Sequence, residues 1–200
     1  MHDVLDELYQ RWADGDQVAV GTVVSTFSSA PRAPGAAMLV AANGEVVGSV
    51  SGGCVEGAVY ELGQQVMEDG KPVLQRYGVS DDDAFAVGLT CGGIIDIYVE
   101  RVDRKSLPEL EEVAESVHKG QPVAVATVVE HENPARLGRH MVVWPDRTSG
   151  TLGSARIDDA VADDARGLLA SGRTGTLHYG LEGERRGEGK IGRASCRERV

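Results

Sequence analysis

The chain has 200 residues and a formal net charge of −11 at neutral pH. This length suffices to bury a core in one large or two small domains without disulfides or metals. The acidic balance excludes broad binding to nucleic acid or to an anionic membrane, because both depend on basic side chains that neutralise phosphates. Three cysteines, with no long apolar run and no signal sequence, indicate a cytoplasmic protein without a membrane anchor.

The first part of the chain predicts a helix, a buried strand and a stiff loop. Asp3 can cap the helix and Gly15 ends it. Residues 18–24 are almost continuously apolar, which is typical of a strand buried on both faces. Two prolines in the segment 28–35 exclude helix and favour a stiff loop that presents Arg32. The apolar face of the helix comprises Val4, Leu5, Leu8 and Trp12.

A β-hairpin is predicted next, and it leads into the central motif of the sequence. Asn43-Gly44 separates two apolar runs and tolerates the positive φ angles of a tight turn. The second run continues into Gly48–Gly57, which combines a strand end, a Gly-rich turn, a thiol and a helix start. The following helix is predicted from Val55, Val59, Leu62 and Val66, and Gly70 ends it.

The motif points to a binding site. A helix N-terminus leaves backbone N–H groups unpaired and stabilises an anion or thiolate beside it. The alternative for Cys54 is a small buried residue at the junction of loop and helix. Glu56 either interacts favourably with the helix dipole or carries protons for the thiol or its ligand. The candidate binding residues here are Ser51, Gly52, Gly53, Cys54 and Glu56.

A second Gly-rich thiol loop lies between two predicted strands, 73–77 and 94–99. Its candidate residues are Cys91, Gly92 and Gly93. The two thiol loops are predicted to converge at one edge of a sheet, although a turn that serves geometry alone also explains the second loop. A closed structural zinc site is not expected, because no CxxC pair or histidine at ligand spacing accompanies these cysteines.

An internal repeat organises the chain. Residues 17–24 and 122–129 agree at six of eight positions. We therefore predict an α/β fold of two related halves, 1–104 and 105–182, each with a mixed sheet, hairpins and flanking helices. The offset between copies is 105 residues at Gly48 and Gly153 but 102 at Gly78 and Gly180. This places a three-residue deletion in the loop of the second copy.

The last residues, 183–200, differ in composition from the rest. They are rich in Gly, Arg and Glu and have almost no apolar periodicity. We expect a disordered or foreign tail there.

Three motifs resemble the XdhC/CoxI family of accessory proteins for molybdenum hydroxylases. They are Gly48-Ser-Val-Ser-Gly-Gly-Cys-Val-Glu-Gly57, Gly88-Leu-Thr-Cys-Gly-Gly93, and Ser29-Ala-Pro-Arg-Ala-Pro-Gly35 with Met38. The resemblance implies a chaperone that binds molybdenum cofactor (molybdopterin), supports its sulfuration by a cysteine desulfurase and delivers it to a xanthine dehydrogenase or CO dehydrogenase-like enzyme. It is compatible with a homodimer. Family members usually continue into a C-terminal Rossmann-type domain, so a truncated chain is expected.

The site residues fit such cargo. The cofactor is an anionic pterin with a phosphate and a dithiolene, which suits helix N–H groups, Arg32 and a soft thiolate. On this hypothesis Cys54 contacts the molybdenum or carries the sulfur, with Cys91 as its neighbour, and no turnover is required.

Two other classes of function remain open. The first is a Cys-dependent enzyme, either a thiol redox protein that pairs Cys54 with Cys91 or an acyl-transfer enzyme with Gly52 and Gly53 amides as oxyanion donors. The second is a pure interaction scaffold, which the high glycine content of the loop disfavours.

Overall fold

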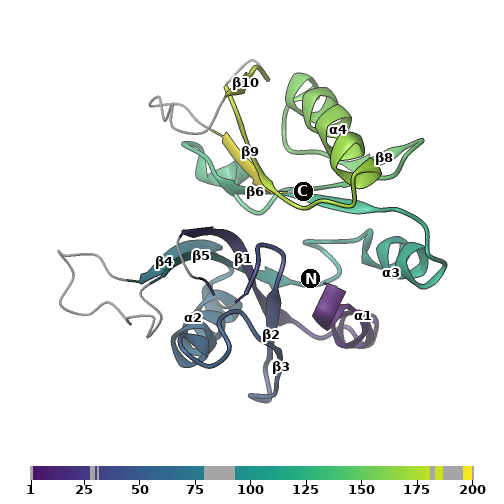
Figure 1. Cartoon of the computed structure of the whole chain (residues 1–200). Coiled ribbons are helices and arrows are strands. Elements are labelled where there is room, and N and C mark those ends of the chain that lie inside the picture. Colours follow the sequence, from purple (N-terminus) through teal and green to yellow (C-terminus); the bar gives the residue numbers. More distant parts are fainter. Residues whose placement is uncertain are drawn as a thin grey trace. The chain divides into compact units, whose positions relative to one another are not determined.

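The chain forms two compact units, Met1–Lys105 and Ser106–Val200. Figure 1 shows them in the computed structural model, which describes residues 2–27, 30, 32–78, 93–180, 183–186 and 196–199. Among the helices in these ranges, none is both long enough and apolar enough to span a bilayer.

Unit 1 is built on one antiparallel sheet with the strand order β3-β2-β1-β5-β4. The predicted helices, the predicted strands and the hairpin are all present. The elements are η1 (His2–Val4), α1 (Leu5–Asp14), β1 (Val18–Phe27), β2 (Ala37–Ala41), β3 (Val46–Gly48), α2 (Glu56–Asp69), β4 (Val73–Gly78) and β5 (Ile94–Val102).

The prediction of a mixed sheet is wrong for the described strands, because every neighbouring pair is antiparallel. Helix α2 does connect two strands that run in the same direction, β3 and β4. These strands lie at opposite edges of the sheet, however, with three strands between them. The crossover therefore creates no adjacent parallel pair, which is what a mixed sheet requires.

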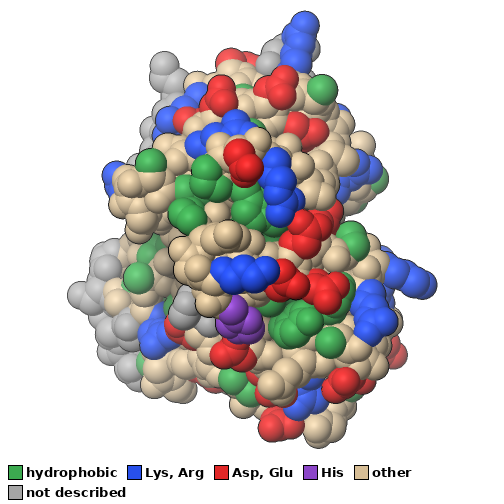
Figure 2. Space-filling model, turned by 90° about the vertical axis from the view of Figure 1, so that its right-hand side faces the viewer, with side chains coloured by type: hydrophobic (Ala, Val, Ile, Leu, Met, Phe, Trp, Pro, Cys, Tyr) green, Lys and Arg blue, Asp and Glu red, His purple; other side chains and the backbone are tan. Residues whose placement is uncertain are grey.

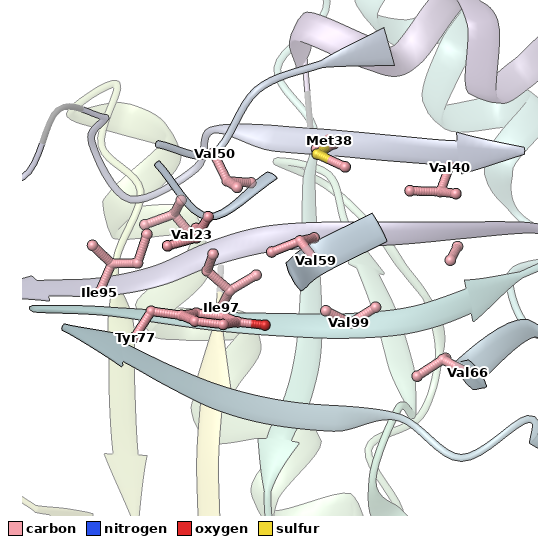
Figure 3. Close-up of a cluster of buried hydrophobic side chains, with 12 residues drawn as sticks. Val23, Met38, Val40, Val50, Val59, Val66, Tyr77, Ile95, Ile97 and Val99 are labelled. Atoms are coloured by element: carbon pink, nitrogen blue, oxygen red, sulfur yellow. The ribbon is translucent and has the colours of Figure 1, made fainter. Parts of the chain in front are cut away.

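Helix α2 covers one face of the sheet, and its apolar residues enter the core between the strands. Val59 lies over β1 and β5 in Figure 3, close to Ile97. Val50 and Val55, which flank the Gly-rich turn, belong to the same buried cluster. The turn is therefore anchored in the core at both ends. The cluster also contains Ala19, Val23, Met38, Val40, Val66, Tyr77, Ile95 and Val99.

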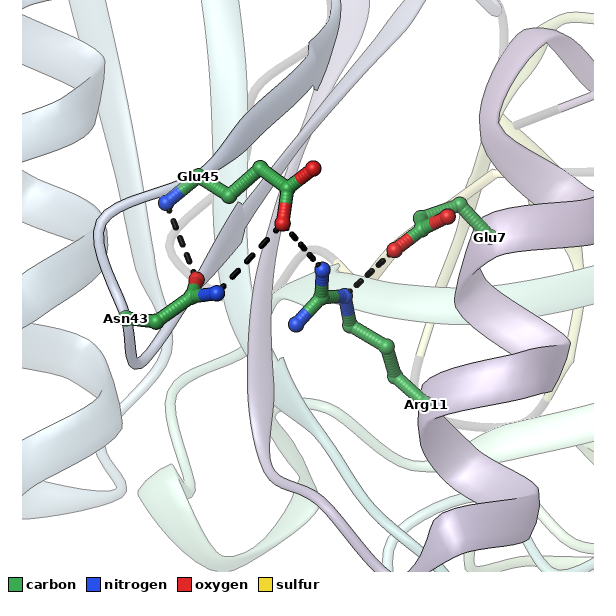
Figure 4. Close-up of polar contacts among 4 residues, drawn as sticks. All are labelled: Glu7, Arg11, Asn43 and Glu45. Carbon is green, nitrogen blue, oxygen red and sulfur yellow. Dashed lines mark hydrogen bonds and ion pairs between the residues drawn. The ribbon is translucent and has the colours of Figure 1, made fainter.

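A polar network joins α1 to the β2–β3 hairpin (Figure 4). Arg11 Nε donates to Glu7 Oε1 and Arg11 Nη2 donates to Glu45 Oε2, each at 2.6 Å. Asn43 Oδ1 accepts from the Glu45 amide at 3.0 Å, as its position in the predicted turn allows. The end of α1 at Gly15 is confirmed, with φ at 86°. The capping role predicted for Asp3 is wrong, because α1 begins after Val4 without a side-chain cap.

Unit 2 has a second antiparallel sheet, with the order β10-β9-β11-β6-β7-β8. Helix α4 packs on β6 and β7, and the core between them includes Met141, Leu152, Ile157 and Tyr179. The elements are α3 (Leu110–His118), β6 (Ala124–Glu130), η2 (Pro134–Arg136), β7 (His140–Val143), β8 (Thr148–Gly150), α4 (Ala155–Ala170), β9 (Thr176–Tyr179), β10 (Arg185–Arg186) and β11 (Cys196–Arg199).

The α/β composition agrees with the prediction. Three strands, a helix and a further strand follow one another in both units, as β1-β2-β3-α2-β4 and as β6-β7-β8-α4-β9. The duplication itself stays a prediction. Within the expected tail, the structure describes two short strands, β10 and β11, which pair with β9 and, for β11, also with β6.

Candidate functional site

The candidate site is the loop between β3 and α2, residues 49–55. Val50, Ser51 and Val55 are buried, and the tip between them is exposed. Ser51 is 1% exposed, whereas Gly52 and Gly53 are exposed and have φ angles of 72° and 110°. A Cβ atom at either glycine would meet no other atom within 4 Å. The tip therefore offers accessible backbone, in a conformation that favours glycine.

The Glu56 carboxylate, in the first turn of α2, organises this loop. Its Oε1 atom accepts hydrogen bonds from Ser49 Oγ at 2.6 Å, Val50 N at 3.2 Å and Ser51 N at 2.8 Å. Its Oε2 atom accepts from Ser51 Oγ at 2.5 Å and from Gly53 N at 2.8 Å. One side chain thus satisfies three backbone donors and two hydroxyl groups.

Two serine hydroxyls bind the remaining amides of the loop. Ser51 Oγ accepts from Cys54 N at 3.0 Å and from Val55 N at 2.9 Å. Ser49 Oγ accepts from Gly52 N at 3.0 Å. Ser51 therefore holds the turn that leads into α2 from five positions before the first residue of the helix, and it is itself held by Glu56.

As a result, all six backbone N–H groups of residues 50–55 donate to side chains of the loop itself. The amides of residues 50–55 are therefore not available to an anionic ligand in the loop as folded, whereas the predicted use of the N–H groups in the first turn of α2, which begins at Glu56, stays a prediction. The glutamate already occupies the place that a bound anion would take. The chemistry this loop can offer a ligand is the exposed glycine backbone and the Cys54 thiol.

The environment of Glu56 also changes its acidity. Burial of the carboxylate favours its neutral form, but hydrogen bonds from Ser49 and Ser51 outweigh this effect and lower the pKa of Glu56 from 4.5 to about 2. Glu56 is therefore ionised throughout the physiological pH range, with both oxygen atoms engaged. These properties argue against the suggestion that it carries protons for the thiol.

The same shift predicts a pH dependence of stability. Because the folded-state pKa lies below the unfolded value, the stabilisation is complete above about pH 4.5 and is lost as pH falls toward 2. Allowing for partial solvent screening, we expect the wild type to lose about 2 kcal/mol more than Glu56→Gln over this range. Urea unfolding of both proteins at a series of pH values measures this. A stability difference that stays constant down to pH 2 would contradict it.

Cys54 is half-buried and packs against the core cluster that Val50 and Val55 enter. This agrees in part with the alternative interpretation of a junction residue. Its two preceding residues are the open glycines, so the thiol lies beside the most accessible backbone of the loop. The described residues contain no group of three or more His, Cys, Asp or Glu side chains suited to holding a metal ion.

Where the structure describes the other predicted residues, they have contacts of their own. Arg32 forms an ion pair with Asp3 at 2.5 Å, in which both side chains are exposed. Gly93 precedes β5, where its carbonyl oxygen packs against Gly78. Cys91 and Gly92 lie outside the described residues, and so does the predicted convergence of the two thiol loops.

Strand register corrects the comparison of the two halves. Gly48 pairs with Met38 across the β2–β3 hairpin, and Gly150 pairs with Met141 across the β7–β8 hairpin. Gly150 is therefore the counterpart of Gly48, and the alignment of Gly48 with Gly153 is wrong. The offset at this point is already 102 residues, so the loop itself contains no deletion.

The counterpart loop in unit 2 uses the same type of contact. Thr151 Oγ1 donates to Asp158 Oδ2 at 2.6 Å, as Ser49 donates to Glu56. Leu152 N donates to Asp158 Oδ1 at 2.8 Å. Each pair joins a hydroxyl to a carboxylate seven residues later. This spacing is visible in both halves of the sequence and could have identified Ser49 and Glu56 as loop-closing residues.

The length difference between the two halves arises before the loop, at earlier points of the chain. Gly21 pairs with Met38, 17 positions later, whereas Ala126 pairs with Met141, only 15 positions later. Two of the three residues are therefore missing from the β6–β7 connection, the counterpart of the Pro-Arg loop, and the third from the hairpin that follows. The two loops therefore have equal lengths and differ in the residues that they carry. Arg156 stands at the position of Cys54.

Comparisons with known proteins agree with the motifs. The model of the XdhC and CoxI family matches residues 11–78 and 116–180. The chain is 33% identical over 153 residues to a probable xanthine dehydrogenase subunit of Bacillus subtilis (strain 168), covering 72% of this chain and 44% of that protein. It is 32% identical over 111 residues to the molybdenum cofactor insertion chaperone PaoD of Escherichia coli (strain K12), covering 56% of this chain and 34% of PaoD.

A solved structure has the same fold. A xanthine dehydrogenase from Bacillus halodurans superposes with a TM-score of 0.63 at 23% sequence identity, covering 77% of this chain and 46% of that one. The chain thus spans less than half the length of these relatives. Because the family model matches more than half of its residues, the chain belongs to the XdhC and CoxI family.

Proposed function

We propose that this protein binds molybdenum cofactor as cargo, supports its sulfuration and passes it to a xanthine dehydrogenase or CO dehydrogenase-type molybdoenzyme. The observation that carries this proposal is the tip of the β3–α2 loop, where two open glycines precede a thiol and the Glu56 network holds the backbone in one conformation. Membership of the XdhC and CoxI family and the relation to PaoD support it.

The residues have distinct roles in this proposal. Cys54 provides a soft ligand that contacts the molybdenum or carries the sulfur, since thiolates suit soft metal centres. Gly52 and Gly53 let the cargo approach the backbone without a side chain in the way. Glu56 positions Gly53, Ser51 positions Cys54 and Ser49 positions Gly52, each through the amide that it binds and without contacting the cargo. A cysteine desulfurase is the expected sulfur donor.

The loop geometry argues against an acyl-transfer enzyme. An oxyanion hole needs N–H groups aimed at the developing charge. The amide of Gly52 instead donates to Ser49 and that of Gly53 donates to Glu56. A new oxyanion would therefore compete with the Ser49 hydroxyl for the first donor and with the ionised Glu56 carboxylate for the second.

The proposal predicts that Cys54→Ser loses its cargo. We expect about tenfold less molybdenum and pterin in this variant than in the wild type when both are purified from cells that make the cofactor, since removal of one charged ligand costs at least about 1.4 kcal/mol. Metal analysis and pterin fluorescence after oxidation measure the two components.

Arg156→Ser is the matched control, because Arg156 occupies the position of Cys54 in the counterpart loop. It should retain cargo at the wild-type level. Equal retention by Cys54→Ser and the wild type would show that the thiol does not hold the cofactor. If the wild type itself contains neither molybdenum nor pterin, the proposed function is wrong.

A further inference from the structure

Two arginines converge on the counterpart loop in unit 2. A Cβ atom at Gly153 would lie 3.3 Å from Arg136 Nε and 3.3 Å from Arg139 Nη1. The two nitrogen atoms are therefore no more than twice that distance apart. Gly153 corresponds to Ser51, so both guanidinium groups lie where unit 1 has its buried serine. The absence of a side chain at Gly153 makes this approach feasible.

This pair of positive charges has no acidic partner among the residues that the structure describes. Arg136 Nη1 lies 3.5 Å from His131 Nε2, and Arg139 Nε donates to the Ala135 carbonyl at 3.2 Å. Three other arginines of unit 2 do form ion pairs, Arg147 with Glu112, Arg166 with Asp163 and Arg185 with Asp164. Figure 2 likewise shows acidic and basic side chains interleaved on one face of the molecule.

Two ionisable side chains, His131 and Asp158, lie near Arg136 or in the counterpart loop region. Burial lowers the pKa of His131, and the charge of Arg136 lowers it further, although Glu132 acts in the opposite direction. The neutral form of His131 is therefore favoured, so the positive charge at this loop comes from the two arginines. The carboxylate of Asp158 is occupied by Thr151 and Leu152 N.

We propose that Arg136 and Arg139 form an oxyanion site that binds the phosphate group of a phosphate monoester. Like charges repel, so a converging arginine pair without a carboxylate partner is stabilised by a bound anion. The guanidinium fork donates two parallel hydrogen bonds, which matches the oxygen spacing of a phosphate. The two corresponding loops then differ in their chemistry, with a thiol in unit 1 and an oxyanion site in unit 2.

Calorimetric titration with inorganic phosphate tests the site directly and does not depend on the proposed function. We expect saturable binding at one site of the wild type, and no such binding when chloride replaces phosphate at equal ionic strength. The double variant Arg136→Gln/Arg139→Gln should bind phosphate at least about tenfold more weakly, since each lost charge-assisted hydrogen bond costs at least about 1.4 kcal/mol. Each single variant should bind phosphate with an affinity between those of the wild type and the double variant.

Arg147→Gln is the matched control, because Arg147 belongs to the same unit but is paired with Glu112. It should bind phosphate as the wild type does. A wild type without saturable binding, or a double variant that binds equally well, would overturn the proposal. Circular dichroism establishes that each variant is folded.

Titration with AMP, and with inorganic phosphate on protein loaded with molybdenum cofactor, distinguishes the sources of the phosphate. Competition by bound cofactor would identify the phosphate of the cargo as the ligand. Undiminished binding to the loaded protein, together with binding of AMP, would identify a separate phosphate monoester. Both results support the site.

Discussion

Replacing Glu56 with Gln is expected to lower the free energy of unfolding by about 2 kcal/mol, which corresponds to roughly 5 °C in melting temperature for a chain of this size. The glutamine has one acceptor oxygen and no charge, so it cannot accept from Gly53 N while it also holds Ser49 and Val50 N. Donors of the loop then lose their partner, and the Gly52–Cys54 tip loses its defined conformation.

Two measurements separate these effects. Urea unfolding gives the loss of stability, and amide hydrogen exchange of residues 50–55 reports the loosening of the loop. On the proposed function, Glu56→Gln also retains less cofactor than the wild type at temperatures where both are folded.

Asp158→Asn is the matched control for this variant. Asp158 makes the same type of contact in unit 2 but accepts from one amide and one hydroxyl, so its loss should cost less. It should leave hydrogen exchange of residues 50–55 unchanged. Equal stability of Glu56→Gln and the wild type, or equal loosening of residues 50–55 by both variants, would contradict the role assigned to Glu56.

A second large effect is expected for Gly48→Ala, which should cost about 3 kcal/mol. Gly48 has a φ angle of 83°, and a Cβ atom there would collide with the Ala37 carbonyl oxygen and lie 2.5 Å from Val4 Cγ1. To remove these two clashes, the β2–β3 hairpin would have to open or η1 would have to move. Because Gly48 is the last residue of β3, the displacement would reach the start of the loop.

Gly15→Ala separates backbone strain from collision. Gly15 has a similar φ angle of 86°, but a Cβ atom there would meet nothing within 4 Å. We therefore expect Gly15→Ala to cost only about 1 kcal/mol, the strain of the left-handed conformation. Chemical denaturation of both variants measures the difference. Similar losses in both would show that the contact with Ala37 is not what requires glycine at position 48.

Local patterns in the sequence predicted the elements of unit 1 well. The apolar spacing of α1 and α2, the Asn43-Gly44 turn and the continuous apolar run of β1 each depend on interactions between near neighbours in the chain. The parallel or antiparallel relation of the strands could not be predicted in this way. It depends on which strands are neighbours, and α2 connects the two edges of the sheet rather than adjacent strands.

The candidate loop was located from its residues, but its chemistry was only partly predicted. Glycines at positions 52 and 53 indicated an open turn, which the structure confirms, and the thiol at position 54 is half-buried beside it. Its role as a soft ligand stays a prediction. The amides were predicted to be unpaired because a helix start in isolation leaves them so. The folded loop brings Ser49, Ser51 and Glu56 to these donors, which an account of the helix alone omits.

The comparison of the two halves was also predicted only in part from the sequence. Repeated Val, Ala and Thr residues identified the corresponding strands, but an alignment by Gly-Ser pairs placed the missing residues in the wrong loop. The register of Met38 with Gly48 and of Met141 with Gly150 located them correctly, because backbone hydrogen bonds define equivalent positions without regard to side-chain identity.

The sequence by itself determined the family, the order of helices and strands as far as β9, and the position of the thiol, because these depend on residue identity and on spacing along the chain. Only the tertiary structure decided which groups satisfy the loop amides, that Arg32 pairs with Asp3, and that Arg136 and Arg139 converge on Gly153. The physical reason is that hydrogen bonds and charge pairs depend on distances of about 3 Å, and these exist only once the core has placed the loops.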